Sequence, residues 1–127
     1  MTDDTRRAEG ARIRSEVLGA DYAERSLEHA SDFSRPMHEF STDCCWGTVW
    51  ARDGLGRRER SLINVAILAA LNRSPQLGVH VRAAVRNGCT REEIQEALLQ
   101  VAVYCGVPAG MEGFRVAEAA LEQLEGQ

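Results

Sequence analysis

The sequence predicts an all-α protein, built as a single-domain bundle of about six helices over residues 1–127. Apolar residues recur at helical spacing along most of the chain, and serine, threonine, proline and glycine stand where helices would start and stop. No stretch shows the sustained alternation of apolar and polar residues that a half-buried strand needs. The length also suits one domain, because domains cluster near roughly 100–150 residues.

The first part of the chain predicts three helices. Residues 4–18 place a few apolar side chains among charges and end at Gly19, which predicts a surface helix. Asp21 is expected to cap a short helix that runs to about residue 29. Ser34 and the proline at position 36 start a helix that runs toward Trp50. The side chains expected on its inner side are Met37, Phe40, Cys44 and Val49.

The middle of the chain, residues 60–90, predicts the centre of the core. From Leu62 to Leu71 the apolar residues surround the helix axis, so this helix should be buried on every side. Ser74 and Pro75 are expected to cap and start a second helix, which Gly88 ends in a left-handed conformation.

Two amphipathic helices are predicted to complete the chain. The first runs from Arg91 to about Tyr104, begins at a capping box and is ended by Gly106 and Pro108. The second covers about residues 109–125 and repeats apolar side chains at helical spacing. A helical chain with one fully apolar helix is expected to need a partner subunit to cover it, which predicts a homo-oligomer.

Composition excludes several classes of function. A net charge of −4 and a pI near 5.4 argue against nucleic-acid binding, for which a clustered positive surface is expected. All fifteen basic residues are arginines, which rules out a lysine Schiff base and a pyridoxal phosphate site built on lysine. No apolar run is long enough for a membrane span and the N-terminus has no apolar signal region, so we expect a cytoplasmic protein that binds no membrane.

The cysteines predict neither a disulfide framework nor a metal site. They stand at positions 44, 45, 89 and 105, without a CxxC pair, and a cytoplasmic chain would keep them reduced. Metal-binding HExxH, glycine-rich dinucleotide and phosphate-loop motifs are also missing from the sequence. Any reaction is therefore expected to proceed without a metal or another cofactor.

His80 and Glu39 are the candidate acid–base residues. His80 shares the apolar stripe of its helix and lies near Arg82, which suits an acid or base beside a fixed positive charge; it also fits a core histidine hydrogen-bonded to a carbonyl. Glu39 could orient an imidazole or move a proton, but a solvated helix glutamate explains it equally simply.

Arginines and aromatic residues supply the candidate binding groups. Arg52 and Arg60 belong to an arginine cluster that is either a solvated face or a holder for a substrate with two carboxylates. Trp46, Trp50 and Tyr104 are either core residues or a dry wall around a planar ring.

Residues 46–110 resemble the carboxymuconolactone decarboxylase family, specifically its 4-carboxymuconolactone decarboxylase branch, with weaker likeness back to about residue 6. Several short motifs carry the resemblance together. They are Trp46-Gly47, Trp50, Arg52, Gly54-Leu55, Arg60-Ser61-Leu62-Ile63, His80, Arg82-Ala83-Ala84, Asn87-Gly88, Thr90-Arg91-Glu92-Glu93, Tyr104-Cys105-Gly106 and Pro108.

The resemblance implies an alkylhydroperoxidase D-like helical fold, assembled as trimers or hexamers with sites between helices. The peroxidase branch carries a CxxC pair shortly before the histidine that matches His80, whereas this chain has Arg73 and Gln76 there. Without two nearby thiols there is no disulfide to cycle, so thiol peroxidase activity is not expected.

The decarboxylase branch implies conversion of 4-carboxymuconolactone to the enol-lactone of 3-oxoadipate with loss of CO2, in the β-ketoadipate pathway of aromatic-acid catabolism. On this hypothesis His80 is the proton donor or the partner of the enolate oxygen, and Glu39 orients it or relays a proton. Arg52 and Arg60 would anchor carboxylates. The residues expected to confine the ring and exclude water are Trp46, Trp50 and Tyr104.

Two other functions remain open at this stage. One is a related decarboxylase or isomerase that acts on another small carboxylated ring, and the other is a non-catalytic oligomer that binds a small acid. Two departures from the branch pattern, Cys44-Cys45 and Met111-Glu112-Gly113, bear on which lactone or keto acid would fit.

Overall fold

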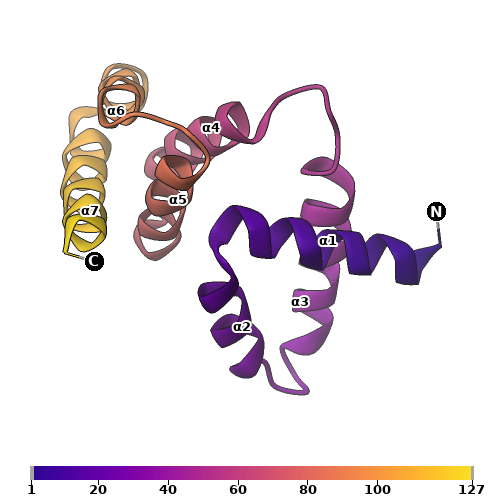
Figure 1. The fold of residues 1–127 in the computed structure, drawn as a ribbon. Helices are drawn as coiled ribbons and strands as arrows, with labels where there is room; N and C mark the ends of the chain where they lie inside the picture. Colours follow the sequence, from indigo (N-terminus) through magenta and orange to yellow (C-terminus); the bar gives the residue numbers. More distant parts are fainter. Residues whose placement is uncertain (1, 127) are drawn as a thin grey trace. The chain divides into compact units, whose positions relative to one another are not determined.

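The structure is a computed structural model, and it describes residues 2–126. These residues form seven α-helices and one π-helix, and none of them lies in a strand, so the all-α prediction is confirmed (Figure 1). The helices are α1 (Asp3–Leu18), α2 (Ala20–Glu28), α3 (Arg35–Phe40), the π-helix η1 (Ser41–Val49), α4 (Arg57–Ala70), α5 (Ser74–Arg86), α6 (Arg91–Cys105) and α7 (Val107–Glu125).

The chain forms two compact units, one on each side of the Gly56–Arg57 bond. Unit 1 contains α1, α2, α3 and η1, and unit 2 contains α4 to α7. That the chain acts as a single domain remains a prediction. Within residues 2–126, no helix has the combined length and apolar character required to cross a membrane.

Unit 1 is built on a close approach between α1 and η1. A Cβ added to Gly10 would lie 2.1 Å from the carbonyl oxygen of Thr42, and one added to Gly47 would lie 2.7 Å from that of Arg6. Only glycine lets the two backbones come this close. Arg14 ties α1 to α2 by donating hydrogen bonds to the carbonyl oxygen of Ala23 and to Ser26 Oγ, at 3.3 and 2.9 Å.

The predicted inner side of this segment is wrong, and over residues 41–49 the π-helix gives the reason. Met37, Phe40, Cys44 and Val49 are all exposed, whereas Trp46, Gly47 and Trp50 are buried. A π-helix closes i→i+5 hydrogen bonds and so has a wider turn than an α-helix. A face assigned with the 3.6-residue period therefore drifts off the real one over residues 41–49. The predicted cap at Asp21 is also wrong, because Gly19 occupies the N-cap position of α2.

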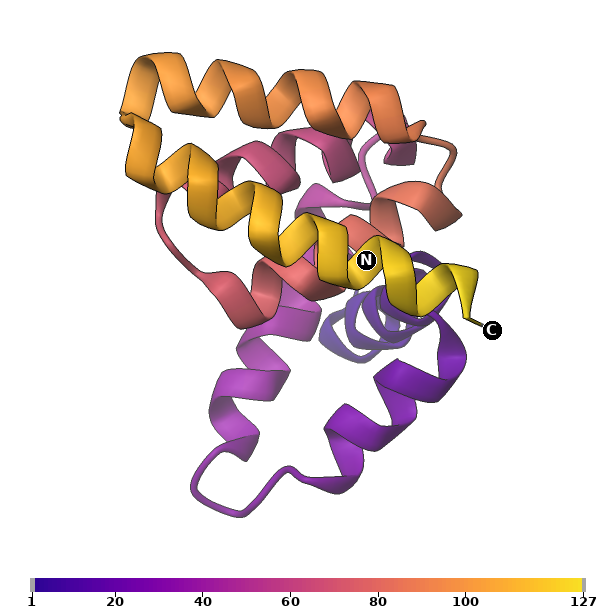
Figure 2. The ribbon, with the colours of Figure 1, turned by 90° about the vertical axis from the view of Figure 1, so that its left-hand side faces the viewer.

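Unit 2 is a four-helix bundle with a continuous apolar core. α4 packs against α5 and α6, and α7 packs against α5 and α6; Figure 2 shows α6 and α7 running side by side in orange and yellow. The most deeply buried side chains of this core are Val65, Leu77, Val81, Ile94 and Leu98.

Two local predictions in unit 2 are confirmed and two are wrong. Thr90 and Glu93 form the capping box, and Gly88 ends its helix with a φ of 102°. The α4 helix is not buried on every side, because one of its faces exposes Ile63, Ile67 and Leu71, by 46%, 46% and 57%. Ser74 does not cap α5: Arg73 holds the N-cap position, and the Ser74 hydroxyl donates to Glu112 Oε2 of α7 at 2.8 Å.

Candidate functional site

His80 lies on α5 and meets α4 at Asn64. The distance between Asn64 Nδ2 and His80 Nδ1 is 3.5 Å, and both side chains are half-buried. Burial lowers the pKa of His80 from 6.5 to about 4, because removing water disfavours the charged imidazolium. At neutral pH the ring is therefore neutral. It carries one N–H donor and one lone pair, which are the groups that an acid–base or hydrogen-bonding role requires.

Arg60 lies one helical turn before Asn64, on the same face of α4. Its Nε is buried, and it finds no hydrogen-bond partner among the described residues. An unpaired buried donor carries a desolvation cost, and the cost is greater for a charged group. One face of α4 thus carries the unpaired donor of Arg60 and, one turn later, Asn64. Asn64 contacts the neutral imidazole of His80.

Two other side chains of unit 2 stand apart from this cluster. Arg82, considered as the positive charge beside His80, donates instead to Gln123 Oε1 of α7 at 2.7 Å. Tyr104 is exposed on α6 and lines an apolar groove of about 310 Å³ with Ile67 and Ala70. The lining of that groove includes neither His80 nor Arg60. A role for Tyr104 in confining the substrate remains a prediction.

Glu39 is held by an ionic network within unit 1. Arg7 of α1 donates to Glu39 Oε2 at 2.9 Å and makes two further hydrogen bonds to Asp43, at 3.0 and 2.8 Å. The pKa of Asp43 is lowered, mainly because its carboxylate accepts a hydrogen bond from Arg7. The carboxylate of Glu39 is therefore oriented by an arginine. Its predicted role, to orient His80 or relay a proton, remains a prediction.

The two tryptophans form the aromatic part of the unit 1 core. Trp46 and Trp50 are buried, and their rings stack with centroids 4.9 Å apart and planes at 30°. This arrangement matches the core alternative weighed from the sequence, since stacked aromatic pairs stabilise packing. Arg52 follows η1 on an exposed turn. That Trp46, Trp50 and Arg52 contact substrate remains a prediction.

Comparison with known proteins decides the family. Residues 36–119 match the Carboxymuconolactone decarboxylase family. The chain belongs to this family. The matched segment contains every residue proposed from the sequence for catalysis or binding, from Glu39 to Tyr104.

Two relatives match the chain over most of its length. The nitrosuccinic acid decarboxylase of Metarhizium robertsii is 41% identical over 116 residues, which cover 91% of this chain and 81% of that protein. The 4-carboxymuconolactone decarboxylase of Acinetobacter baylyi is 40% identical over 124 residues, which cover 98% of this chain and 92% of that protein. Both are named as decarboxylases, although their named substrates differ.

The cysteines of this family member are free. Cys44, Cys45 and Cys105 are exposed and Cys89 is buried. Burial raises the pKa of the Cys89 thiol, which reduces the thiolate fraction needed for attack on a peroxide. Among residues 2–126, no group of three or more His, Cys, Asp or Glu side chains is placed to hold a metal ion.

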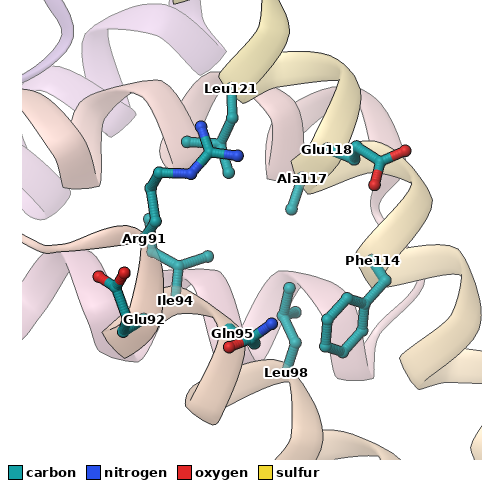
Figure 3. Close-up of a pocket in the computed structure, with 9 residues that line it drawn as sticks. All are labelled: Arg91, Glu92, Ile94, Gln95, Leu98, Phe114, Ala117, Glu118 and Leu121. Carbon is teal, nitrogen blue, oxygen red and sulfur yellow. The ribbon is translucent and has the colours of Figure 1, made fainter.

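A separate pocket of about 190 Å³ lies between α6 and α7 (Figure 3). Its floor is apolar, with Ile94, Leu98 and Phe114, and Arg91 and Glu118 stand at its rim. None of the residues proposed for the decarboxylation site lines it. Arg91 is also committed to an ion pair with Glu125.

Sequence reasoning missed Asn64, although the sequence contains a usable signal. Asn64 is the one polar residue between Leu62 and Leu71, and asparagine is a poor helix former. It also follows Arg60 by four positions, which places both side chains on one face. A polar residue inside an apolar helix, one turn from a candidate carboxylate-binding residue, predicts that its side chain has a specific hydrogen-bond partner.

Proposed function

We propose that this protein converts 4-carboxymuconolactone to the enol-lactone of 3-oxoadipate and CO2, as a step of aromatic-acid catabolism. The chain is a carboxy-lyase that acts on a carboxylated small molecule, as its relatives at 41% and 40% identity are. The observation that carries the proposal is the buried, unpartnered Nε of Arg60, one turn from the residue that meets the neutral ring of His80.

The substrate itself supplies the electron sink for this reaction. Its departing carboxylate is attached to the saturated ring carbon next to the double bond that is conjugated with the lactone carbonyl. When the bond to CO2 breaks, its electron pair moves through the ring double bond to the lactone carbonyl oxygen and gives a furan-like enolate. Protonation of ring carbon then completes the enol-lactone. The protein must hold two carboxylates, stabilise the enolate oxygen and permit this proton transfer.

His80 suits the second of these tasks. A ring with a pKa of about 4 is neutral at pH 7. Its remaining N–H can donate a hydrogen bond to the oxyanion that develops in the transition state. The partly buried position strengthens that hydrogen bond, because the local dielectric is lower than that of water. Of the two roles predicted for His80, the partner of the enolate oxygen therefore fits better than the carbon acid.

Arginine residues suit the first task, which is to hold the two carboxylates. The Nε of Arg60 is a ready donor for a carboxylate, and binding an anion there would give the buried group the acceptor that it lacks. We assign Arg52 to the second carboxylate and Glu39 to the orientation of His80 or to proton relay. The aromatic residues assigned to exclude water from the ring are Trp46, Trp50 and Tyr104.

Nitrosuccinic acid is a second candidate substrate, favoured by the 41% identical relative from Metarhizium robertsii. It shares two features with 4-carboxymuconolactone: two carboxylates, and an electron-accepting group on or conjugated with the carbon that loses CO2. In nitrosuccinic acid the nitro group accepts the electron pair. The same cation and the same neutral imidazole donor would serve either acid.

We also propose that the protein is a homo-oligomer, a trimer or a hexamer. Unit 2 leaves large apolar side chains exposed on α4, α6 and the start of α7, and a second subunit would remove them from water. They are Ile63, Ile67, Leu71, Leu99, Val103, Tyr104, Val107 and Met111.

The decisive experiment follows CO2 release from each of the two acids, freshly prepared, by metal-stripped protein whose mass in solution is measured by light scattering. We expect release from 4-carboxymuconolactone, a loss of roughly 100-fold or more in kcat for His80→Ala, and a raised KM for Arg60→Ala. Arg86→Ala, which removes an exposed arginine at the end of α5, is the matched control.

The outcomes separate the proposals. Release from nitrosuccinic acid alone would replace the first substrate with the second. Release at the buffer rate from both would contradict both substrates, and a monomeric mass would contradict the oligomer.

A further inference from the structure

We propose that Asn64 is a positioning residue that fixes the tautomer of His80. Its amide N–H donates to His80 Nδ1, so the single ring proton sits on Nε2, where it faces the substrate. This inference rests on the proposed function for its catalytic consequence, but the tautomer itself is a property of the free protein.

The contact between the two side chains defines the direction of the hydrogen bond. Asn64 Nδ2 lies 3.5 Å from His80 Nδ1. An amide nitrogen carries two hydrogens and has no lone pair to offer, so it acts only as a donor. His80 Nδ1 must then be the acceptor. A neutral imidazole has one N–H, which leaves the proton on Nε2.

The neutrality of the ring gives the tautomer its importance. Burial holds the pKa of His80 near 4, so at neutral pH the ring has a donor on one nitrogen only. With the proton on Nε2, that nitrogen can donate to an enolate oxygen. With the proton on Nδ1, the same nitrogen would present a lone pair to the oxygen and repel it. The identity of the α4 residue beside Nδ1 therefore decides what the ring offers.

The placement of Asn64 in the sequence agrees with such a role. It interrupts a run of apolar residues on α4, where asparagine lowers helix propensity. It is also one turn from Arg60, so one face of α4 carries the donor to the carboxylate and the residue that orients the ring. We expect Arg60 to affect substrate binding and Asn64 to affect the chemical step.

The test reads the tautomer directly by nitrogen-15 NMR of the imidazole rings in the full-length protein, without substrate. The protein has three histidines, so the His80 signals are assigned by their absence from His80→Gln. At pH 7 we expect Nδ1 of His80 to be unprotonated and Nε2 to be protonated. A protonated Nδ1 in the unmodified protein would overturn the proposal.

Asn64→Asp provides the sharpest variant, because it keeps the shape of the side chain and replaces the donor with an acceptor. We expect Nδ1 to become protonated, because the carboxylate accepts a hydrogen bond there, and its negative charge also opposes an enolate beside the ring. We expect kcat to fall by roughly 10- to 100-fold, with KM changed less than kcat. Asn72→Asp, on the exposed turn after α4, makes the same chemical change and is the matched control. An Asn64→Asp protein with an unmoved proton would contradict the inference.

The two proposals fail in different ways. A ring protonated on Nε2 in a protein that decarboxylates neither acid would contradict the proposed substrates and support the assignment of Asn64. Decarboxylation by a protein whose ring is protonated on Nδ1 would do the reverse.

Discussion

The two units of the chain are held together by different kinds of contact. In unit 2 the buried apolar side chains form one continuous cluster that all four helices share. In unit 1 the buried apolar side chains are few: Ile13, Val17, Ala23, Trp46 and Trp50. Unit 1 relies in addition on the close backbone approach at Gly10 and Gly47 and on the hydrogen bonds of Arg7 and Arg14.

The difference shows which substitutions each unit tolerates. A core of packed side chains responds most strongly to lost volume, because the cavity left behind closes only in part. A backbone-to-backbone contact responds most strongly to added volume, because a carbonyl group held in a helix cannot move aside. The proposed Arg60–Asn64–His80 cluster lies in the unit with the continuous core, which provides a rigid support for it.

The largest effect on stability is expected from Leu98→Ala in unit 2. Leu98 is 1% exposed within the shared core, so its truncation should lower the free energy of unfolding by about 3 kcal/mol, within a range of roughly 2–5. Leu99→Ala removes a neighbour that is 47% exposed and should change it by about 0.5 kcal/mol or less. Urea denaturation measures both, and equal losses would contradict the burial of Leu98.

Hydrogen exchange on the Leu98→Ala protein sharpens the comparison. Faster exchange confined to residues 57–126 would show that the units open separately. Equal acceleration in residues 2–56 would show that they unfold together and would support the predicted single domain.

Acid is expected to weaken unit 2 before unit 1. Unfolded histidine has a pKa of 6.5 and folded His80 one of about 4, so between these values the unfolded chain binds a proton that the folded chain does not. Stability should therefore fall as the pH drops from 6.5 to 4, by at most roughly 1.4 kcal/mol per pH unit and by about 2–3 kcal/mol in total.

The unit 1 network should respond later. The pKa of Asp43 lies below its ordinary 3.8, so the stability it contributes is present above that value and is lost only as the pH falls further. Urea midpoints between pH 7 and 4 measure the effect, and His80→Gln should have a flatter pH dependence than the unmodified protein. Equal slopes would show that His80 is not the group responsible.

Two glycine substitutions test the backbone contact and should give the smallest effects, of opposite sign. Gly10→Ala places a Cβ against the Thr42 carbonyl and should lower the free energy of unfolding by about 2 kcal/mol. At Gly78 on α5 the added Cβ meets only ordinary contacts, the nearest at 3.7 Å, so Gly78→Ala should stabilise by about 0.5–1 kcal/mol through helix propensity. Stabilisation by both substitutions, measured by thermal unfolding, would contradict the close approach.

The sequence predicted the elements well where local signals act alone. The capping box at Thr90 and the left-handed glycine at position 88 depend on hydrogen bonds and backbone angles within a few residues, and both are confirmed. The family was also recognisable, because its motifs are short stretches of contiguous residues.

Local signals failed where a distant part of the chain competes for the same group. Ser74 has the hydroxyl of a capping residue, yet the carboxylate of Glu112 lies 38 positions away and accepts its hydrogen bond. The π-helix likewise has no marker in a pattern read with the α-helical period, and within it Cys44 and Val49 are exposed. Asn64 was overlooked because its partner, His80, lies on another helix.

The sequence by itself determined the helical class, most helix ends, the family and the candidate His80, because periodicity, capping and short motifs are encoded within a few turns of chain. Only the tertiary structure decided what surrounds His80. Its neutral state comes from burial, and its neighbour Asn64 comes from the packing of α4 against α5. Desolvation and hydrogen-bond direction depend on which atoms meet in space, and no local pattern encodes that.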